Sequence, residues 1–306
     1  MQNKTILLTG GTGFLGSHLL ERLINDGYKV ILLKRTNSNL SKINGLIDKI
    51  KFYDIDKLEK LELVFENHKI NSIIHTSTDY GRREGDFNKI IDANLLFPIK
   101  LLELGIKYGI NTFINSDTFW DDNMELPIGL SYYAYSKKDF IKYSKKLIEK
   151  SNIKFINIKL EHLYGPKDNE SKFIPYIINS LLKNVESIDL TEGKQKKDFI
   201  YINDAINAYI YILNNVGKIN ISFEEFDLGI GKTLSIKELL LKINNIIKAN
   251  TLMNFGKLIY RKGEAMESKA NIEKLNNFGW QYEYDIDRGI LETINYFKFL
   301  LRNNGK

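Results

Sequence analysis

The chain has 306 residues, of which 43% are hydrophobic and 27% are charged, and its formal net charge is +6 at pH 7. This length allows one large α/β unit or two closely joined domains with a substantial core. The chain has no cysteine, which excludes disulfides, thiolate nucleophiles and cysteine-ligated metals. Its histidines lack the spacing of metal ligands, so we expect no metal site. The four are His18, His68, His75 and His162.

Several classes of location and partner are disfavoured by the sequence. No run approaches the roughly 18 apolar residues that a membrane span needs, and the first apolar run belongs to the fold, not to a signal peptide. We therefore expect a cytoplasmic protein that binds no membrane. The positive charge invites a nucleic-acid partner, but the lysines are scattered in short clusters, as on a solvated surface. We expect no nucleic-acid partner and favour an anionic small-molecule ligand.

The first expected element is a strand that runs into a glycine cluster. Residues 5–16 read Thr-Ile-Leu-Leu-Thr-Gly-Gly-Thr-Gly-Phe-Leu-Gly and are followed by an amphipathic stretch, which indicates strand, tight turn and helix. Gly10 allows the turn, Gly13 lets a pyrophosphate approach the backbone, and Gly16 lets the helix pack on the strand. The helix N-terminus favours phosphate. We expect a dinucleotide to be bound by Gly10, Thr12, Gly13, Phe14, Leu15 and Gly16.

Strands and helices alternate from Thr5 to about residue 160, which is typical of a parallel sheet covered by helices. The expected strands are 29–33, 49–55, 72–77, 112–115 and 154–160, and the expected helices are 58–67, 87–108 and 131–150. Later helices are expected at 173–183, 203–215, 235–248 and 285–301, and a later strand at 226–228. The predicted fold is α/β: a Rossmann-like doubly wound parallel sheet with a smaller, interleaved C-terminal α/β substrate lobe. A glycine-rich turn in another α/β fold is the alternative.

The end of the second strand indicates the cofactor. An acid there would accept hydrogen bonds from a free ribose 2′-hydroxyl, whereas this chain has Lys34 and Arg35. Two cations fit a 2′-phosphate, which arginine can bind through two N–H groups. We expect NADP(H) in preference to NAD(H); two solvated basic residues are the alternative. Asp54, at the next strand end, is either an acceptor for the adenine amino group or a surface acid.

Tyr133 and Lys137 lie four residues apart, on one face of the helix that follows the fifth strand. A cation beside a phenol lowers the phenol pKa from about 10, which makes it usable for proton transfer. Ser116 and Thr118 stand at the end of the fifth strand, where their hydroxyls can hold a carbonyl oxygen. The alternatives are a surface lysine on an amphipathic helix and a turn or cap role for the hydroxyls.

Together these motifs resemble the extended short-chain dehydrogenase/reductase family of nucleotide-sugar enzymes, over nearly the whole chain. Further matches are residues 75–77, Asn94, 164–166, 197–204, 261–264 and 278–280. The resemblance implies that Ser116, Thr118, Tyr133 and Lys137 are catalytic. The cofactor residues that it implies beyond the glycine loop are Lys34, Arg35, Asp54, Ile55, Thr76, Ser77, Thr78, Asn94, Tyr133, Lys137, Leu160 and His162. The substrate residues that it implies are Asp79, Tyr80, Ser116, Thr118, His162, Lys172, Phe173, Lys197 and Arg261.

Departures from the family's patterns reduce the number of reactions that the chain is expected to catalyse. Thr118 stands where the 4,6-dehydratases carry a glutamate. Thr118 and Lys172 also stand where the GDP-fucose synthase type has its cysteine and histidine. A plain 4-keto reduction remains, and strings such as 160–169 look like the CDP-abequose and CDP-paratose synthases. Those enzymes reduce CDP-4-keto-3,6-dideoxyglucose to CDP-3,6-dideoxyhexoses for O-antigen. His162 and Lys159 replace the family's usual Asn and Arg, a change expected to reshape the sugar pocket.

The resemblance thus implies an NADPH-dependent nucleotide-sugar 4-ketoreductase. The alternatives are a 4-epimerase with bound NAD and a non-catalytic NADP-binding regulator of the same fold. We expect residues 1–165 to form the NADP-binding domain, with 198–228 returning to it. Residues 166–197 and 229–306 would form the nucleotide-sugar-binding lobe. Because the family commonly dimerises through the helices at 87–108 and 131–150, a homodimer is expected.

Overall fold

The computed structural model describes residues 4–81, 87–120 and 130–304, and these fall into two compact units. The first unit holds the described residues within Met1–Trp120, Ile128–Lys159 and Ile206–Phe226. The second holds those within Leu160–Ala205 and Asp227–Lys306. Because the chain returns to the first unit after entering the second, the predicted interleaving is confirmed.

The unit boundaries differ from the expected ones at two places. The second unit begins at Leu160 and keeps residues 198–205, whereas we expected a boundary after residue 165 and a return at 198. Strand pairing explains the difference. β7 (His162–Tyr164) runs parallel to β9 (Lys196–Tyr201), so both strands belong to a sheet of the second unit.

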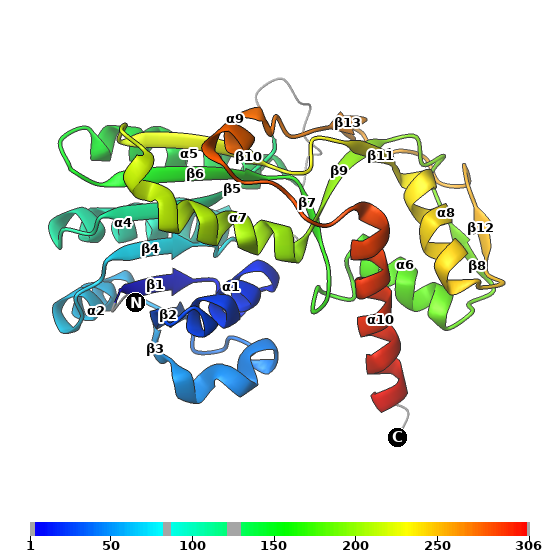
Figure 1. Cartoon of the computed structure of the whole chain (residues 1–306), viewed down its shortest axis with the longest axis horizontal. Helices are drawn as coiled ribbons and strands as arrows, with labels where there is room; N and C mark the ends of the chain where they lie inside the picture. Colours follow the sequence, from blue (N-terminus) through cyan, green and yellow to red (C-terminus); the bar gives the residue numbers. More distant parts are fainter. Residues whose placement is uncertain (1–3, 82–86, 121–129, 305–306) are drawn as a thin grey trace. The chain divides into compact units, whose positions relative to one another are not determined.

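The first unit is built on a seven-stranded sheet in the order β10-β6-β5-β4-β1-β2-β3 (Figure 1). The strands are β1 (Thr5–Thr9), β2 (Lys29–Lys34), β3 (Lys51–Asp54), β4 (Ser72–His75), β5 (Thr112–Thr118), β6 (Lys154–Leu160) and β10 (Phe223–Leu228). β1 pairs in parallel with both β2 and β4, and the β2–β3 and β4–β5 pairs are also parallel. The strand order therefore reverses between β1 and β4, and sheets of this kind bind ligands outside the strand ends at such a point.

Helices cover both faces of this sheet, as the doubly wound prediction requires. α1 (Phe14–Asn25) and α7 (Ile202–Asn215) lie together on one face (Figure 1), where Arg22 donates a hydrogen bond of 2.6 Å to the side chain of Asn207. On the other face, α2 (Leu61–Asn67), α4 (Phe97–Lys107) and α5 (Ser131–Ile148) contribute to one apolar core. The remaining helical segments of this unit are η1 (Ser41–Lys49), η2 (Leu58–Lys60), α3 (Phe87–Ile91), the π-helical turn η3 (Asp92–Leu96) and η5 (Val216–Lys218).

The second unit has two small sheets. β7, β9, β11 (Thr233–Ser235) and β13 (Glu267–Ser268) form one, and β8 (Ser187–Asp189) pairs with β12 (Leu252–Asn254) in the other. Its helices are α6 (Phe173–Leu182), α8 (Ile236–Ile247), α9 (Glu273–Phe278) and α10 (Ile286–Asn304). α8 begins with a capping box in which Ser235 and Glu238 each accept the other's backbone N–H, so its predicted start is confirmed.

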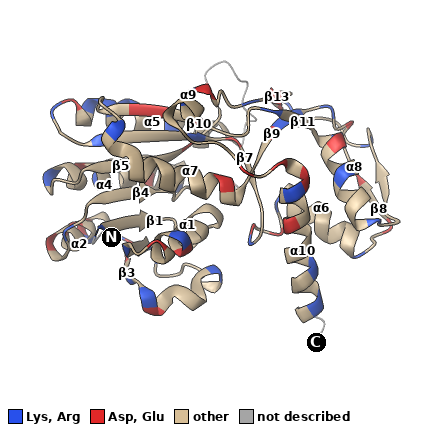
Figure 2. Cartoon of the chain, in the orientation of Figure 1, with Lys and Arg blue, Asp and Glu red and all other residues tan. Residues whose placement is uncertain are grey.

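Charge is distributed over the helices of both units. Figure 2 shows basic and acidic residues interspersed along helices such as α10. No helix within the described ranges is long and apolar enough to cross a membrane. The same residues contain no group of three or more His, Cys, Asp or Glu side chains that would hold a metal ion.

Candidate functional site

The loop after β1 is shaped by its glycines. Gly10 has a φ of +72°, in the left-handed region that favours glycine. A Cβ at Gly10 would lie 2.6 Å from the backbone nitrogen of Ser77, and a Cβ at Gly16 would overlap the carbonyl oxygen of Gly10. The first turn of α1 can therefore pack against the ends of β1 and β4 only because both positions lack a side chain.

Gly13 leaves space on the outer side of this loop. It precedes α1 and gives the helix no side-chain cap. A Cβ at this position would have only one near neighbour, the carbonyl oxygen of Gly10 at 3.1 Å. The first N–H groups of a helix lack intrahelical acceptors and carry the positive end of its dipole. The loop that also contains Thr12, Phe14 and Leu15 thus fits the diphosphate of a dinucleotide.

The end of β4 is fastened to the end of β1 by a buried histidine and a threonine. Thr9 Oγ1 lies 2.8 Å from Nδ1 of His75 and accepts hydrogen bonds from the N–H groups of Thr76 and Ser77, both at 3.3 Å. Burial, followed by the charge of Lys137, lowers the pKa of His75 well below its ordinary value. His75 is therefore neutral, and its Nδ1 shares a hydrogen bond with the Thr9 hydroxyl. Its role is to hold the Thr9 hydroxyl, which in turn positions the backbone of Thr76 and Ser77 at the end of β4.

Asn94 ties the next loop to α5. The π turn that carries it interrupts the single helix predicted at 87–108, and π turns are frequent at functional sites. Its Oδ1 accepts from the N–H of Asp79 at 2.8 Å and from the hydroxyl of Thr78 at 3.2 Å. Its Nδ2 donates to the carbonyl oxygen of Asp79 at 2.8 Å and to Ser136 Oγ at 3.2 Å. The amide holds protein groups on both sides, so any effect of Asn94 on a cofactor passes through the loop that it positions.

β5 and α5 bring the four residues predicted to be catalytic together. Lys137 Nζ donates a hydrogen bond to the backbone carbonyl oxygen of Ser116 over 2.7 Å. The side chain of Thr118 is hydrogen-bonded to the phenol of Tyr133. None of the four is more than 7% exposed. Tyr80, which we expected in the substrate site, lies beside them, with its ring centre 5.0 Å from that of Tyr133.

Burial sets the titration of this cluster. It lowers the pKa of Lys137 to about 8, against the opposing charge of Asp117. It raises the pKa of Tyr133 well above its ordinary value; Tyr80 adds to the rise and the Thr118 hydrogen bond opposes it. The expectation that Lys137 lowers the pKa of Tyr133 is not met here, because burial is the largest cause of the shift and Lys137, whose ammonium donates to the Ser116 carbonyl oxygen, is not among its causes. A phenol that keeps its proton at neutral pH suits a proton donor.

The two basic residues at the end of β2 are not equivalent. Lys34 forms an ion pair with Asp54, its partner in the β2–β3 register, and its side chain is only 6% exposed. Arg35 is exposed, and its guanidinium forms no hydrogen bond or ion pair with the residues that the structure describes. Only Arg35 therefore fits the expected place of a phosphate-binding cation, and Asp54 is engaged by Lys34. Ile55 donates its N–H to the Lys34 carbonyl oxygen at 2.8 Å.

Several of the residues expected to bind the sugar nucleotide lie in the second unit. His162 Nδ1 is 3.3 Å from Oε2 of Glu161, and Lys197 Nζ donates to the carbonyl oxygen of Ala265 over 2.5 Å. Burial lowers the pKa of Lys197, while Glu264 and Glu161 act in the opposite direction. Burial also lowers the pKa of His162. Basic and acidic groups thus alternate around this short stretch of sheet.

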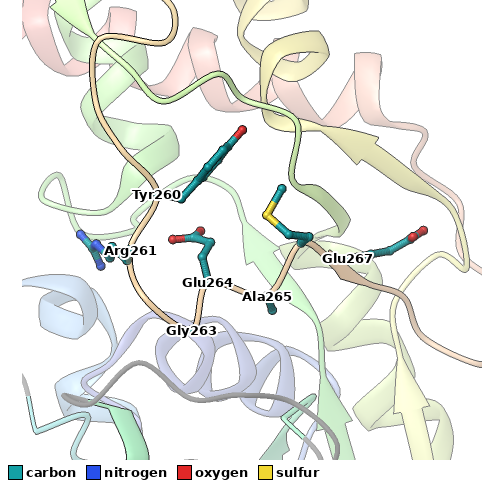
Figure 3. A pocket seen from close by; sticks show the side chains of 7 residues that line it. Tyr260, Arg261, Gly263, Glu264, Ala265 and Glu267 are labelled. Atoms are coloured by element: carbon teal, nitrogen blue, oxygen red, sulfur yellow. The ribbon is translucent and has the colours of Figure 1, made fainter.

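A pocket of about 400 Å³ lies beside these groups (Figure 3). It is lined by Tyr260, Arg261, Gly263, Glu264, Ala265, Met266 and Glu267. Figure 3 shows the Arg261 guanidinium pointing away from the Glu264 carboxylate. An aromatic ring and a guanidinium are groups that can stack on a base and bind a phosphate.

Three further residues of the predicted site also fall in the second unit. Leu160 is the last residue of β6. Lys172 precedes α6 and pairs with the buried carboxylate of Asp168 at 3.0 Å. Phe173 opens α6 and is 41% exposed. The prediction that these residues bind ligand stays a prediction.

Sequence reasoning missed several residues of the first unit's site. Tyr209 of α7 donates a hydrogen bond of 2.6 Å to Ser116 Oγ. The two residues are 93 positions apart in the sequence, so no local motif predicts the contact. Asn157 of β6 donates to the carboxylate of Asp117 at 2.9 Å, and this contact depends on strand neighbours. Ser136 lies inside the Tyr133–Lys137 motif, so its spacing on the helix was a usable signal.

Known proteins resemble this chain over almost its full length. The model of the NAD dependent epimerase/dehydratase family matches residues 6–223. The CDP-abequose synthase of Salmonella muenchen is 36% identical over 294 residues, which is 96% of this chain and 98% of that protein. The solved UDP-glucose 4-epimerase of Thermotoga maritima with UDP-glucose gives a TM-score of 0.83 at 23% identity, covering 97% of this chain and 99% of that one. The Thermus thermophilus UDP-glucose 4-epimerase complex with NAD gives 0.81 at 21% identity, covering 96% and 99%.

Proposed function

The chain belongs to the NAD dependent epimerase/dehydratase family, and from this premise we propose that it is an NADPH-dependent nucleotide-sugar 4-ketoreductase. The proposed substrate resembles CDP-4-keto-3,6-dideoxyglucose, and the product is a CDP-3,6-dideoxyhexose for a surface polysaccharide such as O-antigen. The similarity to a CDP-abequose synthase over 96% of the chain supports this choice.

The contact of Tyr133 with Thr118, beside Ser116 and Lys137, supports the proposal most directly. Bound NADPH supplies the hydride to C4 of the sugar. Tyr133, which keeps its proton at neutral pH, donates that proton to the C4 oxygen. The Ser116 hydroxyl donates a hydrogen bond to the same oxygen and stabilises the negative charge that develops there. Thr118 holds the phenol in place for the transfer.

In this proposal the first unit holds the cofactor. The loop from Gly10 to Gly16 binds the diphosphate at the start of α1, and Lys137 binds the ribose of the nicotinamide. Arg35 binds the 2′-phosphate, which gives the preference for NADPH. The pairing of Lys34 with Asp54 keeps the end of β2 in register with β3.

The second unit, in the same proposal, holds the sugar nucleotide. Lys197 and Arg261 are cations suited to its diphosphate, and the pocket beside Tyr260 is suited to its base. His162 replaces the amide that the family carries at this position and shapes the sugar site. We also propose a homodimer formed through the helical segments at 87–108 and 131–150; the molar mass in solution, measured by light scattering, tests that part.

A panel of substrates tests the function. The protein is incubated with NADPH and, in turn, with CDP-, dTDP-, UDP- and GDP-linked 4-keto-6-deoxysugars and with CDP-4-keto-3,6-dideoxyglucose. We expect NADPH oxidation to be fastest with a CDP-linked 4-keto sugar, one NADPH being consumed per product formed. NMR of the product then identifies the C4 stereoisomer. The absence of NADPH oxidation with every member of the panel would rule out the proposed reaction.

A second candidate is a 4-epimerase with bound NAD. The pairing of Asp54 with Lys34 favours it. Of the two cations at the end of β2, this pairing leaves only Arg35 for a 2′-phosphate among the residues that the structure describes, which weakens the preference for NADP(H) over NAD. The solved structures that share the fold include epimerases. This candidate predicts that the purified protein carries NAD and interconverts a UDP-sugar with its 4-epimer without consuming NADPH. The reductase predicts net oxidation of added NADPH.

A further inference from the structure

A second tyrosine contacts the Ser116 hydroxyl. The distance from Tyr209 Oη to Ser116 Oγ is 2.6 Å. Tyr209 is completely buried and Ser116 is 6% exposed. Neither side chain forms another hydrogen bond with the residues that the structure describes. Solvent thus reaches the pair only from the serine side, and the serine retains hydrogen-bonding capacity.

The direction of this hydrogen bond follows from acidity. A phenol, with a pKa of about 10, is a far stronger acid than an alkyl hydroxyl and is therefore the better donor. Burial raises the pKa of Tyr209 further, so the group stays protonated at neutral pH. Tyr209 therefore donates, Ser116 Oγ accepts, and the serine's own hydrogen remains available to another acceptor. Successive O–H donors polarise one another.

We propose that Tyr209 is a positioning residue for Ser116. By donating to Oγ, it fixes the serine side chain and directs a polarised O–H at the C4 oxygen of the sugar. This inference rests on the proposed ketoreductase function, because it assigns to Tyr209 a share in stabilising the negative charge that develops on that oxygen.

A purely structural role for the Tyr209 hydroxyl is disfavoured by the other bonds of α7. Arg22 of α1 donates to Asn207 over 2.6 Å, and the hydroxyl of Tyr28 donates to Asn214. These bonds, together with the buried ring of Tyr209, hold the helix on the sheet. Removing the Tyr209 hydroxyl while keeping the ring therefore changes little except the bond to Ser116.

Steady-state kinetics of Tyr209→Phe, Ser116→Ala and the double variant test the inference. Tyr28→Phe is the matched control, because it removes a tyrosine bond to the same helix away from Ser116. We expect Tyr209→Phe to lower kcat about tenfold, with KM and the NADPH Kd within about twofold of wild type. The double variant should be no slower than Ser116→Ala alone, because without the serine the tyrosine has nothing to orient. Tyr28→Phe should retain wild-type kcat.

The thermal unfolding temperature of each variant shows whether a lower kcat comes from a destabilised fold or from a misoriented Ser116 hydroxyl. An unchanged kcat in Tyr209→Phe overturns the inference while leaving the reductase intact. Losses that multiply in the double variant also overturn it, because they show that Tyr209 acts independently of Ser116. If the wild type reduces no keto sugar, the proposed function fails and this inference falls with it.

Discussion

Lys137 donates a hydrogen bond from Nζ to the backbone carbonyl oxygen of Ser116, with 2.7 Å between the two atoms. The bond joins α5 to the end of β5, so it aligns the helix face that carries Tyr133 with the strand end that carries Ser116. The lysine is 3% exposed, and an ammonium has three N–H donors. A buried ammonium at this position is therefore suited to binding a polar ligand that reaches the same place.

The affinity for NADPH should fall as the pH rises through about 8. Because burial lowers the pKa of Lys137 to about 8, the side chain loses its charge above that pH. Fluorescence titration should show an NADPH Kd that rises up to about tenfold between about pH 7.5 and about pH 9.5. Lys137→Arg stays charged over this range, so its Kd should not change. The same pH dependence in that variant would show that another group is responsible.

The two cations at the end of β2 should affect different properties. Arg35→Glu should lower kcat/KM for NADPH by about 10- to 100-fold relative to NADH, because it replaces a charge-assisted contact by repulsion. Lys34→Met is the matched comparison. Because Lys34 is paired with Asp54, this variant should lower stability more than it changes the choice of cofactor. Equal losses with NADPH and NADH in Arg35→Glu would contradict a 2′-phosphate site at this position.

The close contact at the start of α1 should not tolerate a methyl group. A Cβ at Gly16 would overlap the Gly10 carbonyl oxygen, so Gly16→Ala should lower the free energy of unfolding by roughly 1–3 kcal/mol and weaken dinucleotide binding. Gly45 provides the control, since a Cβ there would meet nothing within 4 Å. Gly45→Ala should stay within about 0.5 kcal/mol of wild type. Similar effects of the two substitutions, measured by denaturant unfolding, would disagree with the packing described for α1.

Acid should destabilise the protein through His75. The pKa of this histidine is well below its ordinary value in the folded protein, whereas in the unfolded chain it takes up a proton near pH 6.5. The folded state thus binds fewer protons below that pH, and stability falls as the pH drops below about 6.5. Its slope should reach up to about 1.4 kcal/mol per pH unit above the range where carboxylates titrate. His75→Gln should be less stable at neutral pH and show a shallower slope, with the remainder coming from His162 and His68, whose pKa values are also lowered; an unchanged slope would assign all of it to those groups.

The parts of the site that follow from local spacing could be predicted from the sequence. The glycine loop and the Tyr133–Lys137 pair are such cases, because neighbours in sequence remain neighbours on a turn or a helix face. Contacts set by tertiary packing could not be predicted. Lys34 and Asp54 lie 20 residues apart and meet only through strand register. The raised pKa of Tyr133 depends on burial, which no spacing reveals.

Parts of the fold could not be predicted either, because the sequence pattern carries too little signal for them. The π turn at 92–96 does not alter the apolar periodicity enough to separate it from a continuous helix. β7 and β13 are three and two residues long, too short to show a strand period. Since β7 pairs with β9, missing β7 also misplaced the boundary between the units.

Turnover of Tyr133→Phe measures the central claim most directly. The substitution removes the phenolic proton and keeps the ring, so the protein should still bind NADPH with the wild-type Kd. Its rate of NADPH oxidation with the preferred 4-keto sugar nucleotide should fall by about 100- to 10,000-fold. A rate within a few-fold of wild type, with the fold intact, would contradict proton donation by Tyr133.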